Sequence, residues 1–173
     1  MTTPAGHIVL VGSMGAGKST IGRAIAERLG RRLVDGDEEL ERRTGKTAAA
    51  VAASDGAEIL HREEAAVVRD VLTGDEPVVL AAAASVVDDD ETRDRLRDPA
   101  VRVVWVRAPR AVLRRRALAG EHRPFVQGDP DAVLRLDRDR APRYEDVADV
   151  VLDEHDGTDP TRLAATAVDA LGA

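Results

Sequence analysis

The chain has 173 residues, 43% of them hydrophobic, which suits one globular domain and argues against intrinsic disorder. Its formal net charge of −7 disfavours binding to nucleic acid or to an anionic membrane surface. Cysteine is absent, which excludes disulfides, thiolate metal sites and a cysteine nucleophile. No stretch approaches the roughly 20 apolar residues of a membrane helix and no signal-peptide pattern is visible, so we expect a cytoplasmic protein.

The clearest motif, Gly12-Ser13-Met14-Gly15-Ala16-Gly17-Lys18-Ser19-Thr20, lies between a predicted strand at 8–11 and a predicted helix at 18–29. The pattern G-x-x-x-x-G-K-[ST] is typical of a phosphate-binding loop, in which backbone N–H groups and the helix N-terminus surround a phosphate. The dinucleotide fingerprint fits poorly, because Thr20 stands where its third small residue would be. The motif therefore predicts ATP binding by Gly15, Ala16, Gly17, Lys18, Ser19 and Thr20, with the Ser19 hydroxyl on magnesium.

Two aspartates follow the second predicted strand, 32–34, and precede a predicted helix at 38–43. Ligands of open α/β sheets bind at the carboxyl ends of the strands. We therefore expect Asp35 and Asp37 on the same rim as the phosphate-binding loop. The alternative is that these acids only cap the helix that follows them.

Helical and strand-like segments alternate along the rest of the chain. Strands are predicted at 77–80, 101–106 and 147–152, and helices at 47–53, 58–72, 109–118 and 161–171. Two more helices are predicted, one ending at Leu96 and capped by 88–90, the other ending near Arg140. This alternation predicts a three-layer α/β/α domain with a parallel sheet between helices.

The whole chain resembles the shikimate kinases, which are small P-loop kinases. The resemblance rests on Gly12 to Thr20, Asp35-x-Asp37 with Glu38-Glu39-Leu40, Arg43 to Lys46, the segment 56–69, Arg123-Pro124, and Arg140-Ala141-Pro142-x-Tyr144. It implies a single P-loop kinase domain over residues 1–173, a five-stranded parallel sheet and a mobile lid at about 119–129. It also implies a monomer that transfers the γ-phosphoryl group of ATP to a ring hydroxyl of shikimate, a small-molecule substrate.

The resemblance implies roles for residues on the nucleotide side. Lys18 would bind the β- and γ-phosphates, and Ser19 would ligate magnesium, with Asp35 helping through water. Arg116 and Pro160 fall where the family sandwiches adenine between a guanidinium and a proline. Taken alone, Pro160 is also an ordinary first residue of a helix.

On the acceptor side, Asp37 would bind the attacking hydroxyl and accept its proton, and Arg140 would bind the substrate carboxylate. Arg123 would close over the phosphates from the lid. Substrate contacts are also expected from His61 and Ala83.

His61 and Ala83 mark two departures from the family. His61 stands where the family has an arginine that binds the substrate carboxylate, and Ala82 to Ala84 replace a glycine triplet. A protonated His61 could replace part of the missing charge, or His61 could be a half-exposed helix residue without a ligand. The sequence thus leaves two alternatives open: a P-loop kinase for a different small hydroxylated acceptor, and a noncatalytic ATP-binding protein.

Overall fold

A computed structural model describes residues 5–119, 129, 131–155 and 157–172. One parallel sheet has the strand order β2-β3-β1-β4-β5, so the predicted five-stranded parallel sheet is confirmed. The strands are β1 (His7–Val11), β2 (Leu33–Asp35), β3 (Val79–Ala81), β4 (Val101–Arg107) and β5 (Val150–Asp153). In the central register, Leu10 lies between Ala81 of β3 and Val104 of β4.

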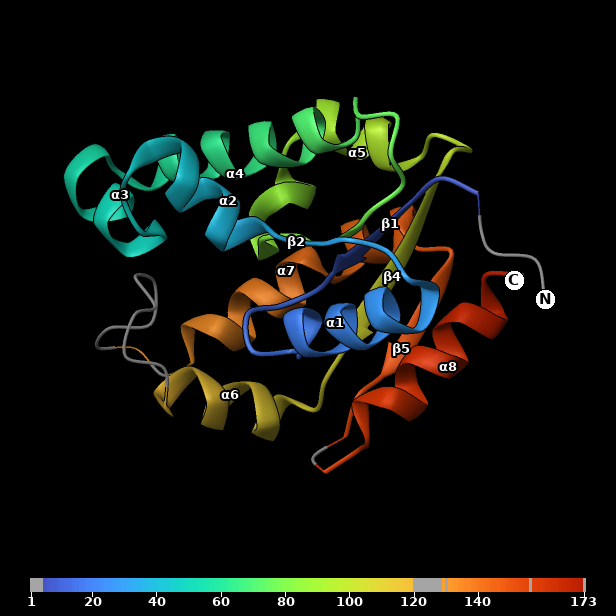
Figure 1. Ribbon diagram of the computed structural model, residues 1–173. Helices are drawn as coiled ribbons and strands as arrows, with labels where there is room; N and C mark the ends of the chain where they lie inside the picture. Colours follow the sequence, from blue (N-terminus) through green and yellow to red (C-terminus); the bar gives the residue numbers. More distant parts are fainter. Residues whose placement is uncertain (1–4, 120–128, 130, 156, 173) are drawn as a thin grey trace.

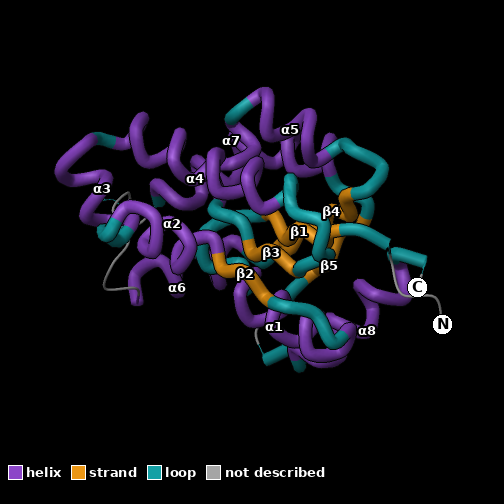
Figure 2. The backbone as a smooth tube through the Cα atoms, turned by 45° about the horizontal axis from the view of Figure 1, so that its top comes forward, coloured by secondary structure: helices purple, strands orange, loops and turns teal. Residues whose placement is uncertain are grey.

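Helices cover both faces of the sheet (Figure 2). They are α1 (Lys18–Leu29), α2 (Gly36–Thr44), α3 (Ala48–Asp55), α4 (Ala57–Val71), α5 (Asp90–Leu96), α6 (Arg110–Ala119), α7 (Ala132–Val147) and α8 (Pro160–Ala170), with a short 3-10 helix η1 (Ala84–Asp88). Successive residues of β1 point to opposite faces, so Ile8 and Leu10 pack with α1 and α8, and Val9 and Val11 with α4, α5 and α7. None of the described helices is long and apolar enough to span a bilayer.

Helices α2 and α3 and the start of α4 extend beyond the β2 edge of the sheet (Figure 1). They have a small core of their own, formed by Leu40, Val51, Leu60 and Val67. This extension holds the N-terminal turn of α2, which follows β2 directly, beside the carboxyl end of the sheet. The element order therefore brings three connections together: β1 to α1, β2 to α2, and β3 to η1.

Two predicted boundaries differ from the structure by three residues or more. The helix expected to end near Arg140 runs through Pro142 to Val147, and β5 begins at Val150 rather than at 147. The helix continues because Arg140, Tyr144 and Val147 form one buried face, whereas Pro142 lies on the exposed side. Of the three acids at 88–90, Asp89 alone accepts the capping hydrogen bond from the backbone N–H of Thr92, at 2.8 Å.

Candidate active site

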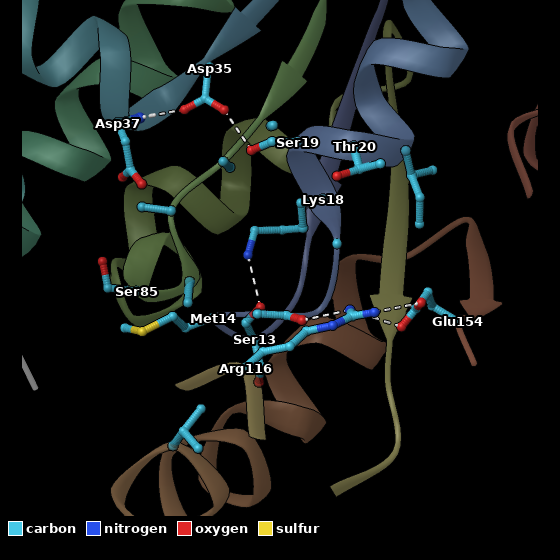
Figure 3. A pocket seen from close by; sticks show the side chains of 18 of the residues that line it. Ser13, Met14, Lys18, Ser19, Thr20, Asp35, Asp37, Ser85, Arg116 and Glu154 are labelled. Atoms are coloured by element: carbon cyan, nitrogen blue, oxygen red, sulfur yellow. Dashed lines mark hydrogen bonds and ion pairs between the residues drawn. The ribbon is translucent and has the colours of Figure 1, made fainter. Parts of the chain in front are cut away.

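A cavity of about 800 Å³ opens over the carboxyl ends of β1, β2 and β3. Figure 3 shows Asp35, Asp37 and Ser19 toward one end of it, Arg116 and Glu154 at the other, and Lys18 between them. The predicted site residues that line it are Gly15, Gly17, Lys18, Ser19, Thr20, Asp35, Asp37, His61, Ala83, Arg116, Arg140 and Pro160. Ala16 is buried and is not among the lining residues. Arg123 and residues 120–128 of the expected lid lie outside the described residues.

The phosphate-binding loop leaves β1 through a glycine that no other residue could replace without strain. Gly12 has φ 138°, and a Cβ there would lie 2.3 Å from the carbonyl oxygen of Val106. Lys18 Nζ reaches back across the loop and donates to the carbonyl oxygens of Gly12 and Ser13, each at 2.9 Å. The ammonium group is thereby held at the mouth of the loop (Figure 3).

Ser19 and Asp35 form a group of hard oxygen atoms beside the loop. The Ser19 hydroxyl donates to Oδ2 of Asp35 at 2.5 Å, while Oδ1 of Asp35 accepts from the backbone N–H of Asp37 at 3.0 Å. Asp35 therefore caps α2 and also lies at the rim of the sheet beside the phosphate-binding loop. The two predictions for this residue, helix capping and a place in the site, are both met. No group of three or more His, Asp or Glu side chains in the described chain could hold a metal. One hydroxyl and one carboxylate suit magnesium, which takes most of its ligands from phosphates and water.

Glu64 and Ser85 line the part of the cavity beside Asp37 and Arg140, which we call the acceptor end. Neither residue was predicted from the sequence. The Glu64 side chain is buried and accepts a hydrogen bond from the Ser85 hydroxyl. The pKa of Glu64 is raised to about 7, mainly by burial and in part by the charge of Asp37, against the opposing effects of the Ser85 hydrogen bond and the charge of Arg140. Glu64 follows His61 by three residues, and this helical spacing is the signal that could have found it.

Arg140, from α7, is buried beside this pair of residues. Its Nε and Nη2 atoms donate to Oδ2 of Asp88 at 2.8 and 2.7 Å, and Asp88 also pairs with Arg143. Within the segment 88–90 that was expected to cap the helix, Asp89 is the cap, whereas the carboxylate of Asp88 holds Arg140 in place. The ion pair also neutralises part of the charge that Arg140 presents to the cavity.

His61, on α4, also lines the cavity and is half-buried. Burial lowers its pKa, and the nearby positive charge of Arg140 lowers it further, against a smaller opposing effect of Asp88. Asp88 opposes this shift without reversing it, so the charged form of the imidazole is less favoured here than in a free histidine. This direction disfavours a cationic His61 as a substitute for the arginine of the family pattern.

The alanines at 82–84 form an unstrained turn. Ala83 has φ −61° and ψ 153°, and every described residue with a positive φ is a glycine. Tyr144, buried on α7, donates from its hydroxyl to the carbonyl oxygen of Ala84 at 2.7 Å and fixes the start of η1. The substitution of glycine by alanine therefore has no cost in backbone strain, and its effect is to add methyl groups to the cavity wall.

The chain is similar to known kinases over nearly its whole length. The sequence model of the family described as shikimate kinase matches residues 14–171. A shikimate kinase from Thermobifida fusca is 38% identical over 167 residues, which are 95% of each chain. One from Paramagnetospirillum magneticum is 40% identical over 151 residues, 86% of this chain and 76% of the relative.

A solved structure agrees with these sequence matches. The shikimate kinase from Acinetobacter baumannii, solved in complex with shikimate, superposes with a TM-score of 0.86 at 30% identity, covering 94% of this chain and 90% of that one. The parallel sheet, the phosphate-binding loop and the extent of these matches lead to one conclusion: the chain belongs to the shikimate kinase family.

Proposed function

We propose that this protein transfers the γ-phosphoryl group of ATP to a hydroxyl group of shikimate. The observation that carries the proposal is that one cavity is lined by Lys18 of the phosphate-binding loop, by Asp37 and by the buried Arg140. A nucleotide-binding protein without catalysis would need only the first of these. The relative from Acinetobacter baumannii, solved with shikimate, supports the choice of acceptor.

Phosphoryl transfer depends on alignment and positive charge more than on covalent catalysis. Lys18 would bind the β- and γ-phosphates. Ser19 would hold magnesium directly and Asp35 through water, and the ion held there would supply neutralisation of charge on the transferred group. Gly15, Gly17 and Thr20 would contribute loop atoms around the phosphates, the buried Ala16 would anchor the loop to the core, and Pro160 would pack against the nucleotide base with Arg116.

Asp37 acts on the acceptor. Its carboxylate lines the cavity at the start of α2, where its backbone N–H is fixed by Asp35. It accepts a hydrogen bond from the attacking hydroxyl and then its proton. Arg140 binds the acceptor carboxylate, while His61 and Ala83, which also line the cavity, contact the acceptor ring.

Several further features belong to this proposal. Residues 1–173 act as one kinase domain, a monomer in the cytoplasm with no nucleic-acid or membrane partner, and the lid at about 119–129 brings Arg123 to the phosphates. We expect Arg123→Ala to lower kcat by roughly 10³-fold with little change in ATP affinity. Sedimentation of the purified protein tests the oligomeric state, and we expect the mass of one chain.

One observation favours an acceptor other than shikimate. His61 and the alanine methyl groups make the acceptor end of the cavity less cationic and narrower than the family pattern implies. ADP release should therefore be followed with magnesium, ATP and either shikimate or a panel of polyols and hydroxy acids. The proposal predicts the highest kcat/KM with shikimate. Faster turnover of another acceptor would assign the second function, and nucleotide binding without turnover of any acceptor would leave only a binding protein.

A further inference from the structure

A second ion pair lies at the opposite end of the cavity from Arg140. Glu154 directly follows β5 and is only 6% exposed, although it lines the cavity. Its two carboxylate oxygens accept hydrogen bonds from Arg116 of α6, from Nη2 at 3.0 Å and from Nη1 at 3.1 Å. This two-pronged geometry fixes both the position and the plane of a guanidinium group.

The same guanidinium also contacts the phosphate-binding loop. Nη1 of Arg116 donates to the carbonyl oxygen of Gly15 at 3.0 Å, and the backbone N–H of Glu154 donates to the carbonyl oxygen of Arg107 at 2.7 Å. Glu154 is thereby anchored to the end of β4 while it holds Arg116 against the loop (Figure 3). Three parts of the chain that are distant in sequence meet at one side chain.

This arrangement suits a flat ligand better than a phosphate. The carboxylate neutralises most of the charge of Arg116, which weakens its attraction for phosphate oxygens. Hydrogen bonds of a guanidinium lie in its plane, so they do not compete with stacking of a heteroaromatic ring on its face. The cavity wall near this end also includes Pro160 and Leu163, which offer an apolar surface.

We infer that Glu154 is a positioning residue for the nucleotide base: it holds the Arg116 guanidinium in the orientation on which the base stacks. The inference rests on the proposed binding of ATP. Without Glu154, Arg116 would have to be ordered each time a nucleotide binds, at the expense of affinity. The effect should be confined to ligands that carry a base, because Glu154 neutralises much of the charge that Arg116 could offer to phosphates.

The test compares two ligands, magnesium–ATP and magnesium–triphosphate, by calorimetric titration of wild type and Glu154→Gln. The glutamine keeps the size of the side chain, but its NH₂ group cannot accept from the guanidinium. Asp153→Asn is the matched control, because Asp153 is adjacent, about half-exposed and paired with Arg107 outside the cavity. Unfolding temperatures of all variants show that each one is folded.

We expect Glu154→Gln to weaken the binding of ATP relative to that of triphosphate by roughly 3- to 10-fold. Triphosphate binding itself should not weaken, because the variant removes the carboxylate that neutralises Arg116. Arg116→Lys keeps the charge without the plane and should cause a similar loss. The double variant should bind ATP no more weakly than the weaker of the two single variants, because Glu154 acts through Arg116.

Equal losses for ATP and triphosphate would overturn the inference, because Glu154 would then act on the loop or on the fold. Unchanged ATP binding in Glu154→Gln, or fully additive losses in the double variant, would also overturn it. If the wild-type protein binds triphosphate as tightly as ATP, the base contributes nothing to affinity. That result would refute the inference about Glu154 and leave the proposed function standing. A wild-type protein that binds neither ligand would refute the proposed function itself, together with the inference that rests on it.

Discussion

The hydroxyl of Ser85 donates a hydrogen bond to the carboxyl group of Glu64, and both side chains are buried at the acceptor end of the cavity. With its pKa raised to about 7, Glu64 is divided between neutral and ionised forms at neutral pH. The charge of the acceptor end therefore changes within the physiological range, through a residue other than His61.

Glu64 makes the stability of the protein depend on pH. The folded protein keeps the Glu64 proton up to about pH 7, whereas the unfolded chain releases it near pH 4.5. The free energy of unfolding should therefore fall, by up to about 3 kcal/mol, as the pH rises between these values. Glu64→Gln cannot ionise, so urea unfolding at pH 5 and pH 8 should show a smaller fall in the variant.

The matched control is Glu58→Gln, an exposed substitution on the same helix, which should keep the wild-type dependence on pH. If Glu64→Gln loses as much stability as wild type between pH 5 and pH 8, ionisation of the buried Glu64 is not the cause of the fall in the free energy of unfolding.

The KM for an acceptor carboxylate should also rise with pH, because ionised Glu64 repels it and offsets the charge of Arg140. We expect the rise to be centred near pH 7 in wild type and to be absent from Glu64→Gln. Because burial and Arg140 lower the pKa of His61, His61→Gln should alter the pH dependence of KM only on the acidic side, apart from any pH-independent change caused by loss of the ring contact. A rise between pH 7 and pH 8 that disappears in His61→Gln would assign the effect to the imidazole instead.

An arginine at position 61 should restore the missing cation. A charged hydrogen bond contributes about 1.5–3 kcal/mol, so His61→Arg should lower the KM for shikimate by roughly 10- to 150-fold at unchanged ATP KM. Arg62 points about 100° away around α4, and Arg62→Gln is therefore the control, with little expected effect. An unchanged KM in His61→Arg would mean that the wall of α4 does not contact the acceptor carboxylate.

Gly36 is required by the close approach of α2 to the end of β3. A Cβ at this position would lie 3.0 Å from the carbonyl oxygen of Ala81 and 3.4 Å from the backbone nitrogen of Ala83. Gly36→Ala should displace Asp37 by a few tenths of an ångström and lower kcat by roughly 10-fold, with ATP affinity preserved. Gly74→Ala, where a Cβ would make an ordinary contact away from the cavity, should leave kcat unchanged. If both substitutions lower kcat equally, displacement of Asp37 is not the cause of the loss in Gly36→Ala.

Most of the fold could be predicted, because hydrophobic runs and the phosphate-binding motif are local signals. The end of α7 could not: the sequence predicted an end near Arg140, and the packing of Tyr144 against the sheet explains why the helix continues to Val147. The ion-pair partners of the side chains in the site could not be predicted from the sequence either. Glu154 lies 38 residues from Arg116, and no spacing rule connects two charges across that distance.

The same distinction applies to the acceptor end. The departures at His61 and Ala82–Ala84 were visible in the sequence, but their consequences were not. Backbone angles at Ala83 and the balance between Arg140 and Asp88 around His61 depend on the folded chain. Sequence alone could not decide whether the turn is strained or the imidazole charged.

In the proposed function, the carboxylate of Asp37 and the phosphate-binding loop act together on shikimate. The most direct measurement is the rate of ADP release with magnesium, ATP and saturating shikimate in wild type and in Asp37→Asn. We expect shikimate-dependent turnover that falls by roughly 10²- to 10⁴-fold in the variant while ATP still binds. ADP release by wild type that is no faster with shikimate than without it would contradict the proposed function.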